Sequence, residues 1–133
     1  MIDILKIEEG LWVLEEDGHN VLLKDCLEFG VSKQDKKHLL RVLVMVAEKL
    51  GSYETLEPLI EEEWIKQLVR QEKVLFENIW EARHPGNNAR IIFVIREDDS
   101  IIIAAVNKSQ GSLSQAVNRG VNRWKKFLKE NEQ

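Results

Sequence analysis

The stretch from residue 79 to residue 106 constrains the fold of this chain most strongly. It holds three β-branched runs of strand length, at about residues 79–83, 89–96 and 100–106. Two short polar segments separate these runs, and their Pro, Gly, Asn and Asp residues are typical of tight turns. Strands joined this closely must be antiparallel neighbours, because a parallel crossover needs a dozen or more residues. The sequence therefore predicts an antiparallel meander.

Two helices are predicted before the meander. Asn20 can cap a helix that ends near Gly30, and Ser32 can cap a longer one that ends at Gly51. The apolar face of the longer helix consists of Leu39, Leu43, Val46 and Leu50. Because so few residues separate the helices, they are predicted to form an antiparallel hairpin. A strand at residues 11–14 should precede the hairpin. A short helix starting at Pro58 and reaching residue 68 should follow it.

The end of the chain is predicted to be a helix that packs on the sheet. Ser112 is a plausible cap, and Gly120 within the apolar stripe indicates a close approach to the sheet. The stripe consists of Leu113, Val117, Val121, Trp124 and Leu128. Arg119, Arg123 and Lys126 lie along one flank of it. The predicted fold class is therefore α+β: an N-terminal helical hairpin, a three- to four-stranded antiparallel sheet and a C-terminal helix packed on the sheet.

Length and composition indicate one ordinary globular domain over residues 1–133. No apolar run approaches the ~20 residues of a membrane helix, and the N-terminus lacks the features of a signal peptide. We therefore expect a cytoplasmic protein that does not contact a membrane. Cys26 is the only cysteine and fits an apolar helical pattern, so it is predicted to lie in the core. Three scattered histidines predict no metal site, and no cofactor is expected.

The net charge of −4 is unevenly distributed. Residues 80–133 hold nine basic and six acidic side chains, a net charge of +3, which leaves −7 for the first 79 residues. Chance can produce such an asymmetry at this length. It also fits a basic half that binds nucleic acid and an acidic half that binds a basic or amphipathic protein segment.

The order of elements and several local sequence words resemble the RelE/HigB group of bacterial toxins, in its phage-derived branch. N-I-W-E-A-R-H-P-G at 78–86 is similar to the family's "glWElR" strand, and A-R-I-I-F-V at 89–94 to its "yRilf" strand. I-I-I-A-A-V-N-K-S at 101–109 is similar to "ivlLhgFvKKs", and Q-A-V-N-R-G-V-N-R-W at 115–124 to the terminal "eiekAkrR" helix. The resemblance covers nearly the whole chain and is sharpest over residues 78–128. Trp80, Arg83 and Arg90, in this order across one turn, are its most specific part.

The resemblance implies a RelE/ParE-like fold and a type II toxin that cleaves mRNA on the ribosome. A ribose 2′-OH would attack the adjacent phosphate, a step that needs cations aimed at the phosphate and groups that move protons. Arg83, Arg90 and Lys108 match the family's phosphate-binding positions, and His84 is a candidate proton shuttle. Arg119, Arg123 and Lys126 of the terminal helix would either contact RNA or face solvent. The implied partners are a cognate antitoxin protein, the ribosome and mRNA.

Other interpretations of the same residues stay open. Arg83 and Arg90 could form ordinary ion pairs with Glu81 or Glu97. His84 could be an inert turn residue. The remaining histidines, His19 and His38, lack evident partners and are expected at the surface, and Trp80 and Trp124 are expected in the core.

The sequence also departs from the family pattern. Ser109 replaces the second of the paired lysines, and no Tyr or His follows the last strand. Alternative functions are a ParE-like toxin that binds DNA gyrase and a catalytically degenerate phage-derived relative.

Overall fold

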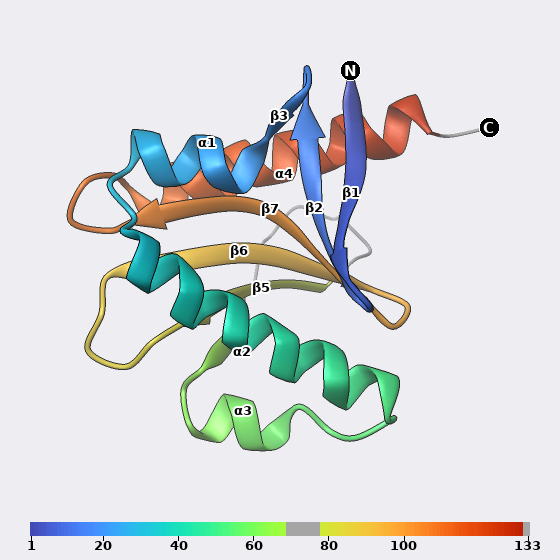
Figure 1. The fold of residues 1–133 in the computed structure, drawn as a ribbon, viewed down its shortest axis with the longest axis vertical. Helices are drawn as coiled ribbons and strands as arrows, with labels where there is room; N and C mark the ends of the chain where they lie inside the picture. Colours follow the sequence, from blue (N-terminus) through green and yellow to red (C-terminus); the bar gives the residue numbers. More distant parts are fainter. Residues whose placement is uncertain (69–77, 132–133) are drawn as a thin grey trace.

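The computed structural model describes residues 1–68 and 78–131, which form an α+β fold. In this part of the chain the elements follow the order β1 (Ile2–Glu8), β2 (Leu11–Glu16), β3 (His19–Asn20), α1 (Val21–Glu28), α2 (Lys33–Gly51), α3 (Glu57–Glu61), β4 (Ile65–Gln67), β5 (Asn78–Arg83), β6 (Ala89–Arg96), β7 (Asp99–Asn107) and α4 (Leu113–Glu130). Seven strands form one sheet in the order β1-β2-β7-β6-β5-β4, with β3 paired to β2 (Figure 1).

The sheet is mixed, so the predicted antiparallel sheet of three to four strands is wrong. β2 and β7 pair in parallel, from Leu11 opposite Ser100 to Val13 opposite Ile102. The other strand pairs described are antiparallel. Three helices and four strands of the described chain separate β2 from β7, so no short turn forces them into antiparallel alignment. The predicted strand at residues 11–14 is confirmed as part of β2, but β1 was not predicted.

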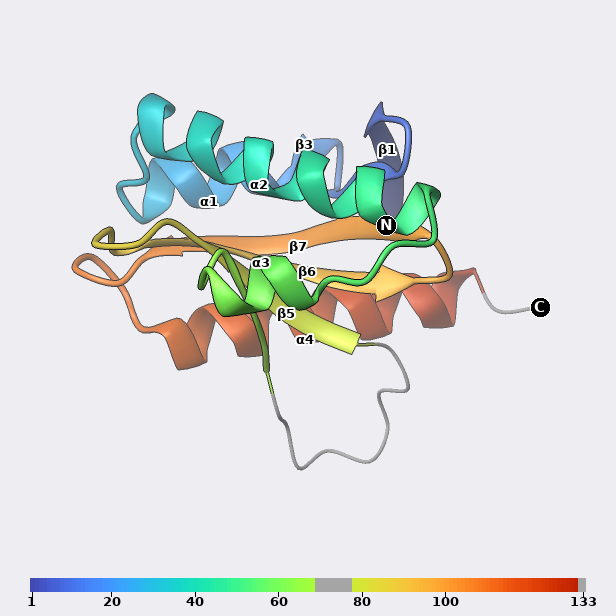
Figure 2. The ribbon, with the colours of Figure 1, turned by 90° about the horizontal axis from the view of Figure 1, so that it is seen from below.

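The predicted N-terminal helical hairpin is also wrong, although both helices exist. Asn20 Oδ1 accepts the backbone N–H groups of Leu22 and Leu23, and Ser32 Oγ accepts that of Asp35, so the predicted caps are confirmed. Three strands precede these helices, and the helices pack on the sheet. α1 lies mainly on β7 and β2, whereas α2 crosses β5, β6, β7 and β2. Figure 2 shows α1 and α2 on one side of the sheet and α4 on the other.

The meander from β5 to β7 is confirmed. β5 and β6 are antiparallel, and Arg83 lies directly opposite Arg90. Gly86, with φ +80°, turns the chain between these two strands. The short helix predicted from Pro58 to residue 68 ends at Glu61 instead, and the chain continues into β4.

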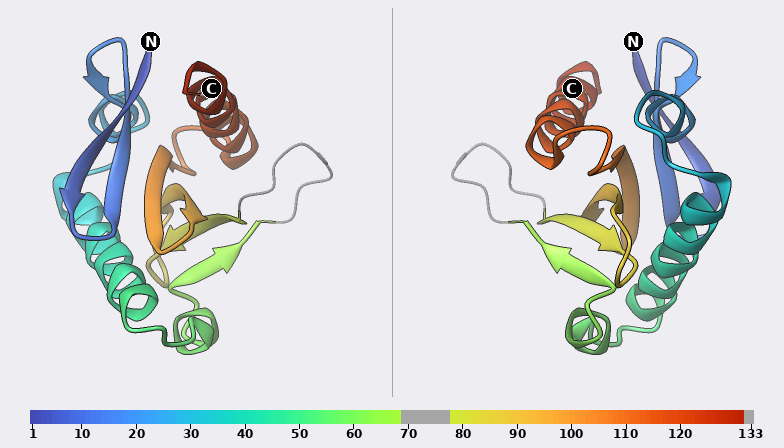
Figure 3. Two further views of the ribbon diagram at one scale, coloured as in Figure 1. Left: turned by 90° about the vertical axis from the view of Figure 1, so that its right-hand side faces the viewer. Right: turned by 90° about the vertical axis from the view of Figure 1, so that its left-hand side faces the viewer.

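The C-terminal helix packs on the sheet as predicted, mainly against β7 (Figure 3). Gly120 permits the close contact, because a Cβ atom there would lie 2.9 Å from Ile103 Cγ1. Trp80 and Trp124 are buried, as expected, and so is Cys26. No helix in the described parts of the chain combines the length and the apolar character that a membrane crossing requires.

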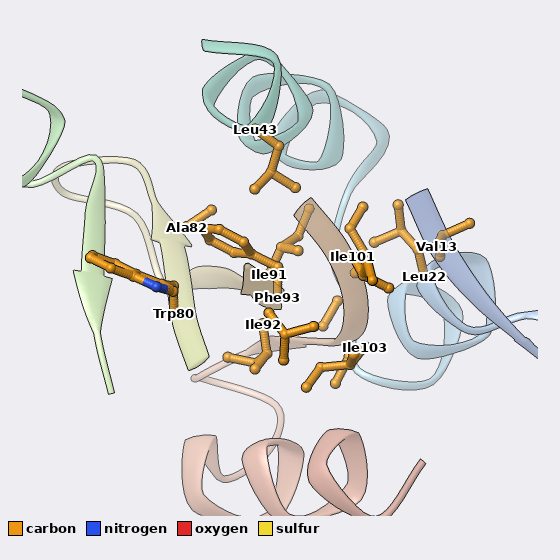
Figure 4. Close-up of a cluster of buried hydrophobic side chains, with 14 of the residues drawn as sticks. Val13, Leu22, Leu43, Trp80, Ala82, Ile91, Ile92, Phe93, Ile101 and Ile103 are labelled. Atoms are coloured by element: carbon orange, nitrogen blue, oxygen red, sulfur yellow. The ribbon is translucent and has the colours of Figure 1, made fainter. Parts of the chain in front are cut away.

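Apolar side chains fill both faces of the sheet. Figure 4 shows Ala82, Ile91 and Phe93 on the side of Leu43 in α2, and Ile92 and Ile103 on the side of α4. Side chains alternate between faces along a strand. Glu81 is the cross-strand partner of Ile92, so Glu81, Arg83 and Arg90 project from the face that carries α4.

Candidate functional site

The first candidate site is a charged cluster on neighbouring strands, hereafter the arginine cluster, which consists of Glu81, Arg83 and Arg90. β5 carries Glu81 and Arg83 two residues apart, and the β5–β6 register sets Arg90 opposite Arg83. Like charges directly opposite one another on a sheet repel. The Glu81 carboxylate is placed to offset that repulsion, because it lies on the same face.

Distances within the arginine cluster show how it is held. Glu81 Oε1 lies 3.8 Å from Arg83 Nη1 and 3.8 Å from Arg90 Nε. Arg90 Nη1 also donates to the backbone carbonyls of Asn87 at 2.6 Å and Ala89 at 2.9 Å. The Arg83 side chain is 27% exposed, against 6% for Arg90 and 4% for Glu81. Glu81 and the two backbone carbonyls therefore hold the Arg90 side chain in place. Arg83 is the cation that solvent or a ligand can reach.

The cluster is incompletely satisfied. Glu81 Oε2, Arg83 Nε and Arg90 Nε are buried and have no hydrogen-bond partner in the part of the chain that the structure describes. Burial lowers the pKa of the Arg90 guanidinium, Glu81 opposes that effect and Arg83 adds to it. Two cations thus share one carboxylate. The arrangement can accept an anion, and an arginine fork matches phosphate oxygens well.

The turn between β5 and β6 joins this cluster to α2 and to the end of β7. Asn87 Nδ2 donates to Asp35 Oδ1 at 2.8 Å, which ties the turn to the first turn of α2. Lys108, just after β7, donates its backbone N–H to the Asn88 carbonyl at 2.9 Å, and its side chain is exposed. The three predicted phosphate-binding residues, Arg83, Arg90 and Lys108, therefore come to one end of the sheet.

Three aromatic rings meet at the same turn, and we call them the ring cluster: His38, Trp64 and His84. The His84 ring centroid lies 5.1 Å from that of His38, with 31° between the planes. It lies 5.4 Å from the Trp64 ring in an edge-on arrangement at 69°. The Arg83 backbone N–H donates to the Trp64 carbonyl at 2.8 Å, so the backbone connects the two clusters. Their side chains lie on different faces of the sheet, because His84 packs on His38 of α2 and the arginine cluster projects from the face that carries α4.

The ring cluster corrects the sequence analysis. His38 was expected to be an isolated surface residue, but it is partly buried against His84. Trp64 was not considered as a site residue at all. No motif could have found these residues, because they lie 20 or more positions apart and only the folded chain brings them together.

A groove between α1 and α4 gathers the other predicted RNA-binding residues. Its volume is about 540 Å³, and it is lined by Glu16, Lys24, Glu28, Arg119, Asn122, Arg123 and Lys126. Its lining is net basic, because four basic side chains, three of them on α4, outnumber the two acidic ones from β2 and α1.

A buried ion pair forms the inner wall of this groove. Asp25 is fully buried and accepts from Arg123 Nη1 and Nη2, each at 2.9 Å. The pair also satisfies the edge of β7, since Asp25 Oδ2 accepts the Ala105 N–H at 3.0 Å and Arg123 Nη1 donates to the Ile103 carbonyl at 3.0 Å. β2 pairs with β7 only as far as Ile102, so these backbone groups have no strand partner on that side. Arg123 is thus held by a structural network.

Arg119 is also occupied. It forms a two-pronged pair with Glu28, at 2.7 and 3.1 Å, and its Nη1 lies 3.3 Å from Asp25 Oδ1. The bond to Glu28 raises the pKa of Arg119, and Arg119 lowers the pKa of the Glu28 carboxyl. Lys126 remains exposed at the groove. Arg119 and Arg123 are thus engaged within the protein and Lys126 is exposed. RNA binding by this flank of α4 stays a prediction.

Among the described residues, no group of three or more His, Cys, Asp or Glu side chains could hold a metal ion. No protein-family model matches the chain, and neither a curated protein nor a solved structure is significantly similar to it. The two clusters at the β5–β6 turn are therefore the features of the described chain that bear most directly on function.

Proposed function

We propose that this chain is the toxin component of a type II toxin–antitoxin pair, and that it cleaves ribosome-bound mRNA in the cytoplasm. The observation that carries this proposal is the arginine cluster, in which Arg83 and Arg90 face each other across two strands with one carboxylate between them. The RelE/HigB resemblance, which names the same two arginines, supports it.

In this proposal the arginine cluster stabilises the charge that grows on the phosphate. The ribose 2′-oxygen bonds to phosphorus, and the bond to the 5′-oxygen of the next nucleotide breaks. Arg83 contacts the phosphate oxygens, because its guanidinium is the accessible one. Glu81 holds Arg83 in position and also offsets the charge of Arg90, and Lys108 adds a third cation at the same end of the sheet. One such preorganised cation contributes roughly 3 kcal/mol, or about a hundredfold in rate.

The chain offers few groups that could transfer protons in the proposed RNA cleavage. The segment after β7 is Lys108-Ser109-Gln110-Gly111, which offers no ring that could move a proton there. We propose that ribosomal RNA supplies part of the proton transfer. Free RNA should therefore be cut poorly or not at all.

The proposed protein partner is an antitoxin. The first 79 residues carry a net charge of −7, so a basic or amphipathic antitoxin segment would dock there and leave the basic second half for RNA. Co-purification with the product of a neighbouring gene tests this part. A binding surface confined to residues 80–133 would contradict it.

Growth arrest on expression, together with cleavage of translating mRNA, tests the enzymatic part. Arg83→Ala and Arg90→Ala should each lower the cleavage rate by about a hundredfold, whereas His84→Ala should have a smaller effect. Arg96→Ala is a matched control, because Arg96 is an exposed arginine on the same strand as Arg90. Circular dichroism and thermal unfolding must show that each variant is folded, since Arg90 is buried.

Three outcomes separate the alternatives. If Arg90→Ala arrests growth as strongly as wild type, phosphate stabilisation by this residue is wrong. If wild type arrests growth but leaves translating mRNA intact, the nuclease proposal fails, and inhibition of gyrase supercoiling tests the binding-toxin alternative. If wild type neither arrests growth nor cuts mRNA, the chain is a degenerate relative.

A further inference from the structure

We infer that Asn87 and Asp35 are positioning residues, which keep Arg90 from closing on Glu81 so that the arginine cluster stays open to a phosphate. The inference rests on the proposed function, because the phosphate that it concerns belongs to the bound mRNA. It does not rest on the resemblance, since neither Asn87 nor Asp35 lies in the sequence words that carry it.

The turn between β5 and β6 holds the Arg90 guanidinium. Arg90 Nη1 donates to the backbone carbonyls of Asn87 at 2.6 Å and Ala89 at 2.9 Å. Arg90 Nε lies 3.8 Å from Glu81 Oε1, which is longer than a hydrogen bond. The turn therefore holds the two charges near each other while they do not form a close pair.

The Asn87 side chain fixes the backbone that Arg90 uses. Its Oδ1 accepts the Ala89 N–H at 2.8 Å, and its Nδ2 donates to Asp35 Oδ1 at 2.8 Å. Asp35 is held in turn, because its N–H donates to Oγ of Ser32, the N-cap of α2. The turn is thus anchored to a helix on the opposite face of the sheet from α4 (Figure 2).

Unpartnered atoms in the arginine cluster indicate what the release of Arg90 would do. Glu81 Oε2 and Arg90 Nε are buried and have no hydrogen-bond partner in the described chain. A carboxylate and an arginine gain most from a close two-pronged pair. Without the turn, Arg90 would form this pair, and Glu81 would leave Arg83, whose Nη1 it faces at 3.8 Å. The accessible cation would then lose the contact that orients it, and a preorganised charge is what stabilises a transition state.

Nitrogen-15 NMR of the arginine side chains tests the positioning in the absence of RNA. The bonds to two carbonyls should slow rotation of the Arg90 guanidinium, so wild type should show separate Nη1 and Nη2 signals, which Arg90→Lys removes. Asn87→Ala and Asp35→Ala should merge these signals. Asp35→Asn keeps an acceptor for Asn87 and should keep the signals separate. Asn88→Ala is the matched control, because Asn88 is the exposed neighbour of Asn87 in the same turn.

Cleavage of ribosome-bound mRNA measures the consequence for the proposed reaction. Asn87→Ala and Asp35→Ala should lower kcat by about tenfold or more and leave KM unchanged, because a small misplacement of a positioned group slows the chemical step. Asp35→Asn should retain most of the rate. Circular dichroism must show that each variant is folded.

The outcomes separate this inference from the proposed function. The inference is wrong if wild type already shows one merged signal for Arg90, or if Asn87→Ala leaves the two signals separate. It is also wrong if Asp35→Asn merges them as Asp35→Ala does, or if Asn87→Ala merges them and still cuts mRNA at the wild-type rate. If the signals respond as expected but wild type cuts no mRNA, the proposed function fails and the positioning of Arg90 by the turn stands.

Discussion

Replacing Asp25 by alanine should lower the stability of the fold more than almost any other substitution of a polar residue. Asp25 is fully buried and is the shared acceptor for two arginines and for the Ala105 N–H. Its removal leaves the Arg123 guanidinium buried, with the Ile103 carbonyl and with Glu16 at 3.5 Å as its remaining partners.

The expected loss of stability follows from the partners that each buried charge keeps after the substitution. Removing one partner of a buried ion pair costs about 3–5 kcal/mol, because the other charge stays desolvated. The loss for Asp25→Ala should be near 4 kcal/mol, which corresponds to roughly 12–20 °C in Tm for a chain of this size. Arg123→Met should cost less, about 2–3 kcal/mol, because Asp25 keeps Arg119 and the Ala105 N–H. Glu28→Gln breaks an exposed pair and should cost less than about 1 kcal/mol.

Urea unfolding followed by circular dichroism measures these free energies, provided that the m-value is unchanged between variants. The double variant Asp25→Ala/Arg123→Met should be less destabilised than the sum of the single changes, since it leaves no unpaired buried charge. The reasoning is refuted if Asp25→Ala destabilises the protein no more than Glu28→Gln, or if the two effects of the double variant are additive.

Three further predictions concern packing, pH and the thiol. Gly120→Ala should destabilise the protein by about 1–3 kcal/mol in thermal unfolding, because the new Cβ has no space. Gly51→Ala, where the space is open, should be neutral or stabilising. Arg119 lowers the folded-state pKa of Glu28 below its ordinary value of 4.5. The stability difference between wild type and Glu28→Gln should therefore be full above about pH 4.5 and vanish as the pH falls through the folded-state pKa; equal differences at neutral and acidic pH would contradict this. Burial raises the pKa of Cys26 to about 11, so a disulfide reagent at neutral pH should label the thiol at least a hundredfold faster in urea than in the native protein.

Much of the local structure could be predicted, because its causes lie within a few residues. The caps at Asn20, Ser32 and Ser112 each accept nearby backbone N–H groups, as their positions indicate. The turn between β5 and β6 is short, so it sets the register and brings Arg83 opposite Arg90. These two residues of the candidate site were therefore accessible from the sequence.

The remaining site residues were not accessible in this way. Glu81 was only one of two possible partners for the arginines, and the choice over Glu97 depended on strand register. Nothing in the sequence singles out Asp25, although it pairs with Arg123, 98 positions later. The pair is explained by the end of β2–β7 pairing at Ile102, which leaves backbone groups of β7 to be satisfied by side chains.

The sequence by itself determined α1, α2, α4, the meander and the pairing of β5 with β6, because periodicity, capping and turn chemistry act over short distances. Only the tertiary structure decided that β2 joins β7 in parallel, that α1 and α2 pack on the sheet instead of forming a hairpin, and that His38, Trp64 and His84 meet at one turn. An apolar strand or helix face specifies that it must be buried but not against what, and the burial of the whole chain makes that choice.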